Sequence, residues 1–466
     1  MVLLHRAVPS AALPSAVSFP ALLPVAAPLT LVGLVVSAAN IVQTDTWVAL
    51  VSGREVALHG LPSVEHLTVL AHGRPWVDQQ WLAQLLLYEV ERIGGVGLVV
   101  AVCAAAALAA FALVAASAQA RGASPVALAF WIPLAFLVGP WGVQARTQSL
   151  ALPLFGLTVW LILRDPDLRS RSSLWLLAVL CVWANVHGSV TLAAAVVCAH
   201  GLQSVLRTGL RRLPLAVCLL APAAVLASPY AAELPGYYRT MLLHPPYGRQ
   251  IVEWQRTTPA NAPLFFAIAV LALVVVAVAR RRLVPAEWTM LVLTFAAALS
   301  AFRLTPWFGL AMLAVVPPLT SRRPTGPEFA RLGPALAAVL LLLTLGAGLA
   351  RSATRDYDGP RELLATVQAG PAPKRVYADL PLADWALWNE PGLRGRIAYD
   401  GRPELMTPAQ FTDVIRFARL APGWSKAVHG YSLIITNHAT AQRLISGHAW
   451  TTAGSSNGVV LLRRAG

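Results

Sequence analysis

The stretch Gln43–Val56, QTDTWVALVSGREV, decides how the whole chain is interpreted. It follows the first long apolar run and carries an acid, Asp45, two residues before Trp47 and ahead of the pair Arg54 and Glu55. A charged side chain at the end of a membrane helix is costly, and such residues usually have a function. The stretch therefore predicts an acid with a role at the point where the first helix leaves a membrane.

The composition indicates a membrane protein. The chain has 466 residues, of which 57% are hydrophobic and 12% charged, and its mean hydropathy is +0.62. Soluble globular proteins carry roughly 25% charged residues. The formal net charge is +15, but no basic run is interleaved with aromatic residues in a soluble domain. We therefore expect no nucleic-acid partner and assign the charge to arginines in cytoplasmic loops.

Apolar runs predict a mainly α-helical, polytopic transmembrane protein with about eleven spans. The runs cover about residues 19–40, 96–118, 125–140, 148–163, 173–187, 190–206, 213–229, 263–279, 285–301, 306–320 and 333–350. If the N-terminus is cytoplasmic, arginine is roughly three times denser in the inside loops than in the outside loops, as the positive-inside rule requires. This topology places the C-terminal region outside the membrane.

Two domains are expected, a transmembrane domain over residues 1–351 and an extracytoplasmic α/β domain over 352–466. The first carries long outside loops at about 40–95 and 229–262, and Leu82–Ile93 has the spacing of an amphipathic helix lying along the membrane surface. In the second, the pattern predicts strands at Arg375–Asp379, Ile397–Asp400, Ser432–Thr436 and Gly458–Arg463, and helices at Pro408–Arg419 and Ala439–Ile445.

Two arginines in very short outside loops, Arg146 and Arg303, are the first candidates for a binding site. The guanidinium group keeps its charge and donates two parallel hydrogen bonds, which suits a phosphate. They fit a site for a lipid-linked phosphate, or equally an anchor to phospholipid head groups or an internal ion pair.

Further polar residues lie in segments expected on the same side. His187, in the segment WANVHGS, is a candidate for positioning a hydroxyl or acting as a base, although a structural role is the simpler interpretation. Glu253 and Arg256 lie in the second long loop beside Trp254, where an acid next to an indole fits a sugar site or an ordinary loop junction.

The first long loop has the highest density of candidates. Asp78 stands between Trp76 and Trp81 in the segment GRPWVDQQWLAQ. Together with Asp45 it offers two acids for the roles of general base and metal ligand. Acids in surface loops are more often only solvated, so spacing alone leaves these roles open.

The order of these motifs resembles the GT-C glycosyltransferase superfamily, as found in bacterial multipass membrane proteins. The resemblance covers nearly the whole chain: the acid–Thr–Trp element at Asp45, SGREVALHGLPS, GRPWVDQQWLAQLLLY, ARTQSLALPLF, WANVHGS, the SPY…EWQ loop, FRLTPWFGLAML, and YDGRPEL followed by Trp424. One departure stands out, because Gln43 occupies a position where relatives carry a second acid.

The resemblance implies a function and a location. GT-C enzymes use polyprenyl-phosphate-linked sugars outside the cytoplasmic membrane, with a catalytic acid in the first outside loop, here Asp45. Arg146 and Arg303, with Arg256 and His187, would neutralise the leaving phosphate, and a divalent cation such as Mg or Mn would bind at Asp45 if at all. The acceptor stays unspecified. The alternatives are a non-enzymatic protein that binds the lipid carrier or assembles the cell envelope and, third, a transporter.

Overall fold

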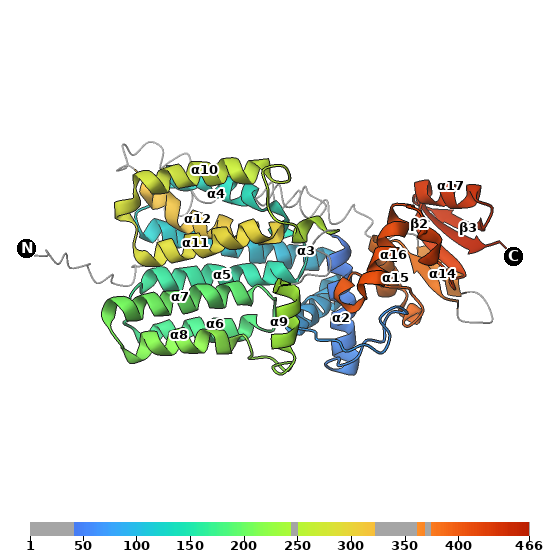
Figure 1. The fold of residues 1–466 in the computed structure, drawn as a ribbon, viewed down its shortest axis with the longest axis horizontal. Helices are drawn as coiled ribbons and strands as arrows, with labels where there is room; N and C mark the ends of the chain where they lie inside the picture. The colour runs from blue at the N-terminus through green and yellow to red at the C-terminus, as the bar shows by residue number, and fades with distance from the viewer. Residues whose placement is uncertain (1–41, 244–249, 322–360, 369–373, 466) are drawn as a thin grey trace, which may run out of the picture.

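The structure, a computed structural model, describes residues 42–243, 250–321, 361–368 and 374–465, and these form two parts (Figure 1). A bundle of apolar helices makes up one end of the molecule, and a small domain with a β-sheet makes up the other. Helices α2 (Thr44–His59) and α9 (Leu234–Leu243) lie at the end of the bundle that faces the small domain (Figure 1).

Nine of the predicted apolar runs coincide with helices of the bundle. These are α3 (Trp81–Ala120), α4 (Pro125–Val138), α5 (Thr147–Arg164), α6 (Trp175–Trp183), α7 (Val190–Thr208), α8 (Arg212–Ala224), α10 (Pro263–Val278), α11 (Pro285–Ser300) and α12 (Thr305–Thr320), with short 3-10 helices η1 (Pro140–Val143), η2 (Arg171–Leu174), η3 (Val252–Trp254), η4 (Arg280–Arg282) and η5 (Phe302–Leu304) between them. The runs 19–40 and 333–350 lie outside the described residues.

Four helical segments of the described chain are long and apolar enough to cross a membrane: α3, α5, α7 and the continuous stretch Phe302–Thr320. The other apolar helices of the bundle have 10–17 residues, shorter than the roughly 20 that a perpendicular span needs. The predicted class, a polytopic helical membrane protein with a small C-terminal α/β domain, is confirmed, whereas the number of spans stays a prediction.

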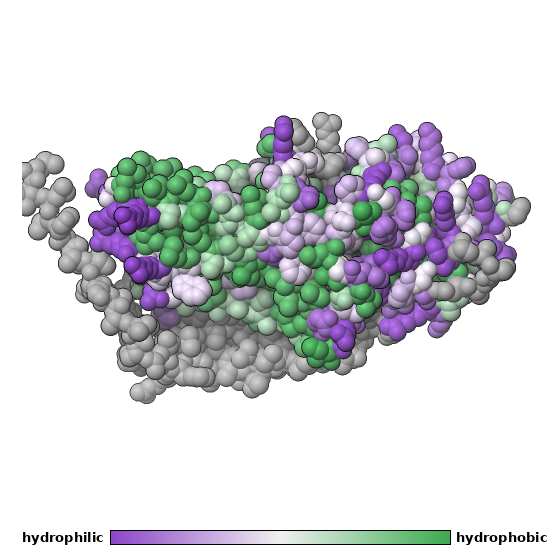
Figure 2. Space-filling view, turned by 90° about the horizontal axis from the view of Figure 1, so that it is seen from below, coloured by the Kyte–Doolittle hydropathy of each residue, from purple (hydrophilic) through white to green (hydrophobic). Residues whose placement is uncertain are grey.

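The hydropathy of the surface differs between the bundle and the small domain (Figure 2). Hydrophobic residues cover most of the bundle in Figure 2, while hydrophilic residues gather at its far end and over the small domain. The far end carries arginines of the loops expected inside. There, Arg121 forms an ion pair with Glu287 of α11, and Arg282 donates to the carbonyls of Pro318 and Leu319 at 3.2 and 3.0 Å.

Local sequence explains where helices begin. Pro125 opens α4 behind Ser124, whose hydroxyl accepts a hydrogen bond from the Ala127 amide at 3.2 Å. Pro285 opens α11, and Glu287 in its first turn accepts a hydrogen bond from the Val284 amide at 2.6 Å. Proline at the first position and a polar side chain capping free amides are common helix starts.

The predicted amphipathic helix forms the first part of α3. The helix is broken at Gly94 and Gly95, where Gly95 adopts a left-handed φ of +68°, a conformation that glycine tolerates best. Within this part of the helix Gln84 is buried and Leu86 is 48% exposed, which an amphipathic spacing alone does not predict. The reason is that α2 packs on this part of α3 and covers Gln84.

The small domain has a four-stranded sheet in the order β1-β2-β4-β3. Its elements are α14 (Arg361–Gln368), β1 (Val376–Ala378), α15 (Leu380–Asn389), η6 (Pro391–Leu393), η7 (Pro403–Leu405), α16 (Pro408–Ala418), η8 (Trp424–Lys426), β2 (Leu433–Asn437), α17 (His438–Ser446), β3 (Trp450–Ser456) and β4 (Val459–Arg464). β1 and β2 are parallel, whereas β4 runs antiparallel to β2 and β3. Three predicted strands and both predicted helices are confirmed within about two residues.

The fourth predicted strand, Ile397–Asp400, is wrong as a separate strand. Ile397 forms only isolated bridges, to Val376 of β1 on one side and to Thr68 of the first long loop on the other. The backbone amides of Val69 and Leu70 donate to the carbonyls of Ile397 and Ala398 at 2.8 and 3.0 Å. The first long loop therefore extends the sheet edge of the small domain and joins it to the bundle.

Candidate active site

The site is built around the first turn of α2. The Gln43 amide donates to the Thr46 hydroxyl at 3.1 Å, and that hydroxyl donates to the Ala145 carbonyl at 2.6 Å. These contacts hold the start of α2 beside the loop that precedes α5. The side chain of Asp45 between them is 53% exposed, so a substrate can reach its carboxylate.

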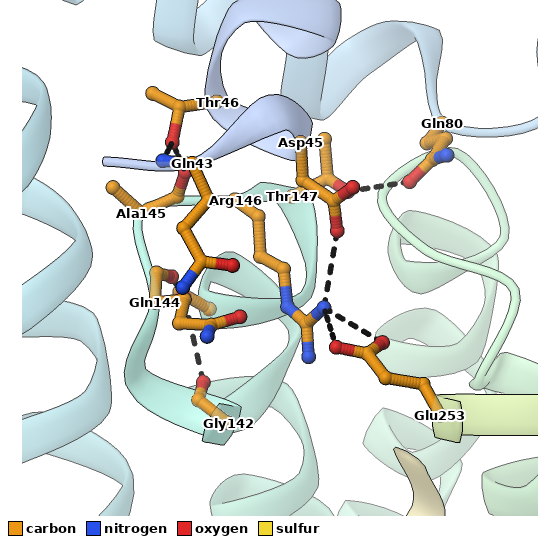
Figure 3. Close-up of polar contacts among 11 residues, drawn as sticks. Gln43, Asp45, Thr46, Gln80, Gly142, Gln144, Ala145, Arg146, Thr147 and Glu253 are labelled. Atoms are coloured by element: carbon orange, nitrogen blue, oxygen red, sulfur yellow. Dashed lines mark hydrogen bonds and ion pairs between the residues drawn. The ribbon is translucent and has the colours of Figure 1, made fainter. Parts of the chain in front are cut away.

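Arg146 joins this turn to the second long loop (Figure 3). Its Nη1 lies 3.0 Å from Asp45 Oδ2 and 3.1 Å from Glu253 Oε2. The Arg146 side chain is only 4% exposed. Burial lowers the pKa of Arg146, but Glu253 and Asp45 outweigh that effect, so the pKa is raised and the guanidinium stays charged.

Backbone position explains how three distant segments meet. Arg146 is extended and stands directly before α5, so its side chain projects from the helix end. The next residue, Thr147, donates its hydroxyl to Gln80 of the first long loop (Figure 3). Glu253 reaches the same place from η3. The loops expected on one side of the membrane thus converge at Arg146.

Arg303 lies next to this ion pair. Its guanidinium stacks over the Trp254 ring, 4.3 Å from the ring centroid, and Trp254 directly follows Glu253. Such stacking leaves the N–H groups of an arginine free to turn outward. Arg146 and Arg303 therefore place two guanidinium groups around one acidic pair.

His187 occupies the turn between α6 and α7. Its ring is buried, and Nδ1 lies 2.8 Å from the Ser189 hydroxyl. Burial, followed by the charges of Arg303 and Arg146, lowers the pKa of His187 well below its ordinary value. A neutral histidine next to the arginines can donate or accept a hydrogen bond without adding charge.

The other predicted site residues lie elsewhere. Trp76 packs under the Arg402 guanidinium of the small domain, 4.1 Å from its ring centroid, and the indole of Trp81 donates to Asn185 at 2.9 Å. Asp78 is buried, and burial raises its pKa to about 7. Arg256 is exposed, and its backbone carbonyl accepts a hydrogen bond from Asn261 at 2.9 Å. The structure gathers Asp45, Arg146, Glu253, Arg303 and His187 but not these four.

The small domain adds residues that the sequence analysis missed as site residues. The turn Asp400–Glu404 lies against the first turn of α2, because a Cβ atom on Gly401 would stand 2.5 Å from Val48 Cγ2 and 3.0 Å from Thr44 Cγ2. Burial raises the pKa of Glu404 to about 7, and Arg402 and Arg303 both act on its carboxylate. The signal was present, since YDGRPEL was already a conspicuous motif in the chain.

The arrangement does not fit a metal ion at Asp45. Among the residues the structure describes, no three His, Cys, Asp or Glu side chains group so as to hold one. The cation between Asp45 and Glu253 is the Arg146 guanidinium itself. The Mg or Mn considered from the sequence therefore has no donor set among the described residues around Asp45.

The fold and the site together define a class: a multi-pass membrane protein with a polar cluster where a helical bundle meets a small sheet domain. Solved structures share this fold, so the resemblance is confirmed at the level of the fold. No family model matches the chain, and no curated protein does either.

Solved structures give the particular relatives. The chain is similar to ArnT from Cupriavidus metallidurans bound to undecaprenyl phosphate, with a TM-score of 0.52 and 15% identity over 95% of this chain and 97% of that one. It is also similar to the oligosaccharyltransferase of Archaeoglobus fulgidus in the apo form, with a TM-score of 0.53 and 12% identity over 90% of this chain and 69% of that one. The oligosaccharyltransferase AglB of that organism, in complex with an inhibitory peptide and a dolichol-phosphate, matches with a TM-score of 0.52 and 12% identity. The match covers 89% of this chain and 69% of that one.

Proposed function

We propose that the protein is a membrane glycosyltransferase that moves a sugar from a polyprenyl-phosphate carrier to an extracytoplasmic acceptor. The observation that carries the proposal is the pairing of the exposed Asp45 carboxylate with the buried Arg146 guanidinium. The proposed setting is a bacterial cytoplasmic membrane, with the N-terminus in the cytoplasm and the small domain in the cell envelope outside. The solved relatives that hold undecaprenyl phosphate and dolichol-phosphate support the choice of carrier.

In the proposed reaction, Asp45 takes the proton of an acceptor hydroxyl. The acceptor oxygen forms a bond to the anomeric carbon, while the bond from that carbon to the phosphate oxygen breaks and its electron pair leaves with the polyprenyl phosphate. Arg303, with Arg146 beside it, stabilises the negative charge that develops on the phosphate. His187, neutral and hydrogen-bonded to Ser189, orients a hydroxyl group of the substrate.

A second function is favoured by one specific observation. Arg146 already satisfies two carboxylates, Asp45 and Glu253, so the same cluster suits a protein that only binds the lipid carrier. That protein would bind polyprenyl phosphate through Arg303 and transfer no sugar. The two functions differ in the fate of the donor.

Asp45→Asn tests the proposal directly. Membranes that contain the protein are supplied with labelled lipid-linked sugars, and labelled product is counted. We expect transfer to fall about 10²- to 10⁴-fold, the range for loss of a general base. Binding of labelled undecaprenyl phosphate should change much less, because the arginines remain.

Asp413→Asn is the matched control. Asp413 also pairs with an arginine, Arg416, at 3.1 Å, but on the exposed face of α16. This variant should transfer like the wild type. Unchanged transfer by Asp45→Asn would remove Asp45 as the base, and a wild-type protein that binds the carrier but transfers no sugar would establish the binding function instead.

A further inference from the structure

A groove lies in the small domain, away from the arginine cluster. It is a groove of about 550 Å³, lined by Trp424, Ser425, Lys426, Val428, His429, Ala449, Trp450 and Arg464. Binding sites for small molecules commonly have volumes of roughly 300–1,000 Å³. Figure 1 shows β3 and the C-terminal end of the chain at the end of the molecule farthest from the bundle, and Arg464 is close to that end.

One wall of the groove is the segment Gly423–Gly430, GWSKAVHG. Both terminal glycines have a left-handed φ of +84°, which lets the chain turn sharply at each end of a short loop. Val428 is buried and anchors the loop to the core. Trp424 packs edge-on against the buried ring of Phe417, with centroids 6.0 Å apart. The loop therefore holds the Trp424 ring in place and leaves the Lys426 side chain exposed beside it.

The opposite wall is the end of the sheet. Trp450 begins β3 and pairs with Arg464 at the end of β4. The Ala465 amide donates to the Ala449 carbonyl at 2.9 Å, and the Arg464 amide donates to the Ser432 carbonyl at 3.2 Å. These bonds fix the backbone of Arg464, while its side chain is exposed beside the groove.

The charged side chains that line the groove are all basic. Lys426 and Arg464 both line it, and neither makes an ion pair with any residue that the structure describes. None of the lining residues, all of them described, is acidic. Unpaired cations over a hollow attract an anion. The arginine can hold a carboxylate or phosphate with two parallel hydrogen bonds.

The aromatic residues narrow the class of ligand. Indole rings offer flat apolar surfaces on which the C–H face of a sugar ring can stack, and the polar edge of the same ring stays available. We propose that this groove binds an anionic saccharide, a sugar chain carrying carboxylate or phosphate groups. Trp424 would stack on a sugar ring while Lys426 and Arg464 bind its anionic group. The site would act whether or not the bundle transfers sugar.

Binding by the full-length protein in detergent tests this proposal by calorimetry. The probes are a galacturonic acid hexamer, a phosphomannan oligosaccharide, neutral maltohexaose and a hexaglutamate peptide. We expect at least one of the two anionic saccharides to bind, with maltohexaose and hexaglutamate each weaker by about tenfold or more. The tighter of the two anionic sugars identifies the anion that the groove prefers.

The variants connect binding to the groove. Arg464→Gln and Lys426→Gln should each weaken the anionic sugar about tenfold, and Trp424→Ala should weaken both anionic and neutral sugars. Arg463→Gln is the matched control, because Arg463 precedes Arg464 on β4 and its side chain points to the other face of the sheet. It should leave binding within about twofold of wild type.

Three results would overturn the proposal. They are no binding of either anionic saccharide at about 1 mM, equal binding of hexaglutamate, or binding that survives Arg464→Gln and Lys426→Gln together. Thermal unfolding of each variant shows whether it is folded, and Arg464 and Lys426 are exposed side chains whose loss should not change the unfolding temperature. Sugar transfer by the wild type is measured separately, so failure of one proposal is distinguishable from failure of the other.

Discussion

Arg146 shows how a single buried cation can organise a site made from distant segments. A single atom of its guanidinium group, Nη1, contacts both Asp45 of α2 and Glu253 of η3. A buried charge is tolerated only when it is paired and hydrogen-bonded, so burial of Arg146 forces both acids to face it. The same pairing holds the Asp45 carboxylate at the edge of the cluster, where a substrate can reach it.

Replacing Arg146 tests this arrangement. Arg146→Gln leaves two carboxylates near each other without a cation, and we expect the free energy of unfolding to fall by about 1–2 kcal/mol, because both acids are partly exposed. Arg146→Lys should recover part of the stability but not the geometry of the fork. Thermal unfolding and retention of undecaprenyl phosphate are the measurements. Arg169→Gln, which removes an exposed pair with Asp167 at 2.9 Å, should change neither.

Asp78 predicts a pH dependence. Its pKa is raised by burial from about 3.8 to about 7, so between these values the folded protein holds a proton that the unfolded chain has lost. Stability should therefore fall as pH rises from about 4 to about 7, and level off above. The unfolding temperature of Asp78→Asn should fall less steeply over that window than that of wild type. A wild-type slope in the variant would assign the pH dependence to another group, with Glu404 the first alternative.

Helix α2 contains nearly all of the stretch QTDTWVALVSGREV, and each part of the helix makes different contacts. Its first turn presents Asp45, its middle packs on α3, and its last turns hold the small domain. Arg54 donates to the carbonyls of Leu387 and Trp388 at 2.6 and 2.8 Å and stacks over the Trp388 ring. The helix is therefore a rigid connection between the acid and the domain beside it.

At Gly53, α2 approaches α3 closely. A Cβ atom there would stand 2.2 Å from the Gln84 carbonyl oxygen and 2.8 Å from Tyr88 Cβ. Gly53→Ala must push α2 away, so we expect a loss of about 1–3 kcal/mol of stability, as in overpacked cores, and reduced sugar transfer. Gly236→Ala is the control, because nothing lies within 4 Å of the added atom in α9. Similar unfolding temperatures for the two variants would contradict the close approach.

The two parts of the protein are held together by buried charge as well as by backbone pairing. Arg402 of the small domain is 4% exposed, donates to Glu65 of the first long loop at 2.9 Å, also binds Asp400, and covers Trp76. Breaking a buried ion pair leaves uncompensated charge, which is strongly destabilising. The position of the small domain over α2, and with it the shape of the site, therefore depends on Arg402.

Arg402→Gln should release the small domain. We expect a loss of about 3–5 kcal/mol and faster cleavage by protease between the two parts. Limited proteolysis in detergent, followed by mass spectrometry, measures the release. Arg416→Gln removes an exposed pair within α16 and should keep the wild-type pattern. If Arg402→Gln resists protease as the wild type does, the backbone pairing of Ile397 and the contacts of Arg54 hold the domain without Arg402.

The pattern of apolar runs predicted the helices because burial in a membrane demands long apolar segments, and turn chemistry marked their ends. The sheet was predicted strand by strand except for β3 and for the edge that another part of the chain supplies. Thr68, far from Ile397 in sequence, supplies that pairing, and no local pattern reports a partner at such a distance. β3 was missed for a related reason, since only one of its seven residues is buried and alternation is absent.

The sequence by itself determined the class of the protein and the helices of its bundle, and it predicts that Asp45, Arg146, Glu253 and Arg303 stand on one side of the membrane. These properties follow from hydrophobicity and from the distribution of arginines, which are local. Only the tertiary structure decided which of the candidates meet. Arg146 pairs with Asp45 and Glu253, whereas Trp76 packs under Arg402 and Asp78 is buried. The physical reason is that a buried charge must find its counterion wherever packing brings one, and packing depends on the whole chain.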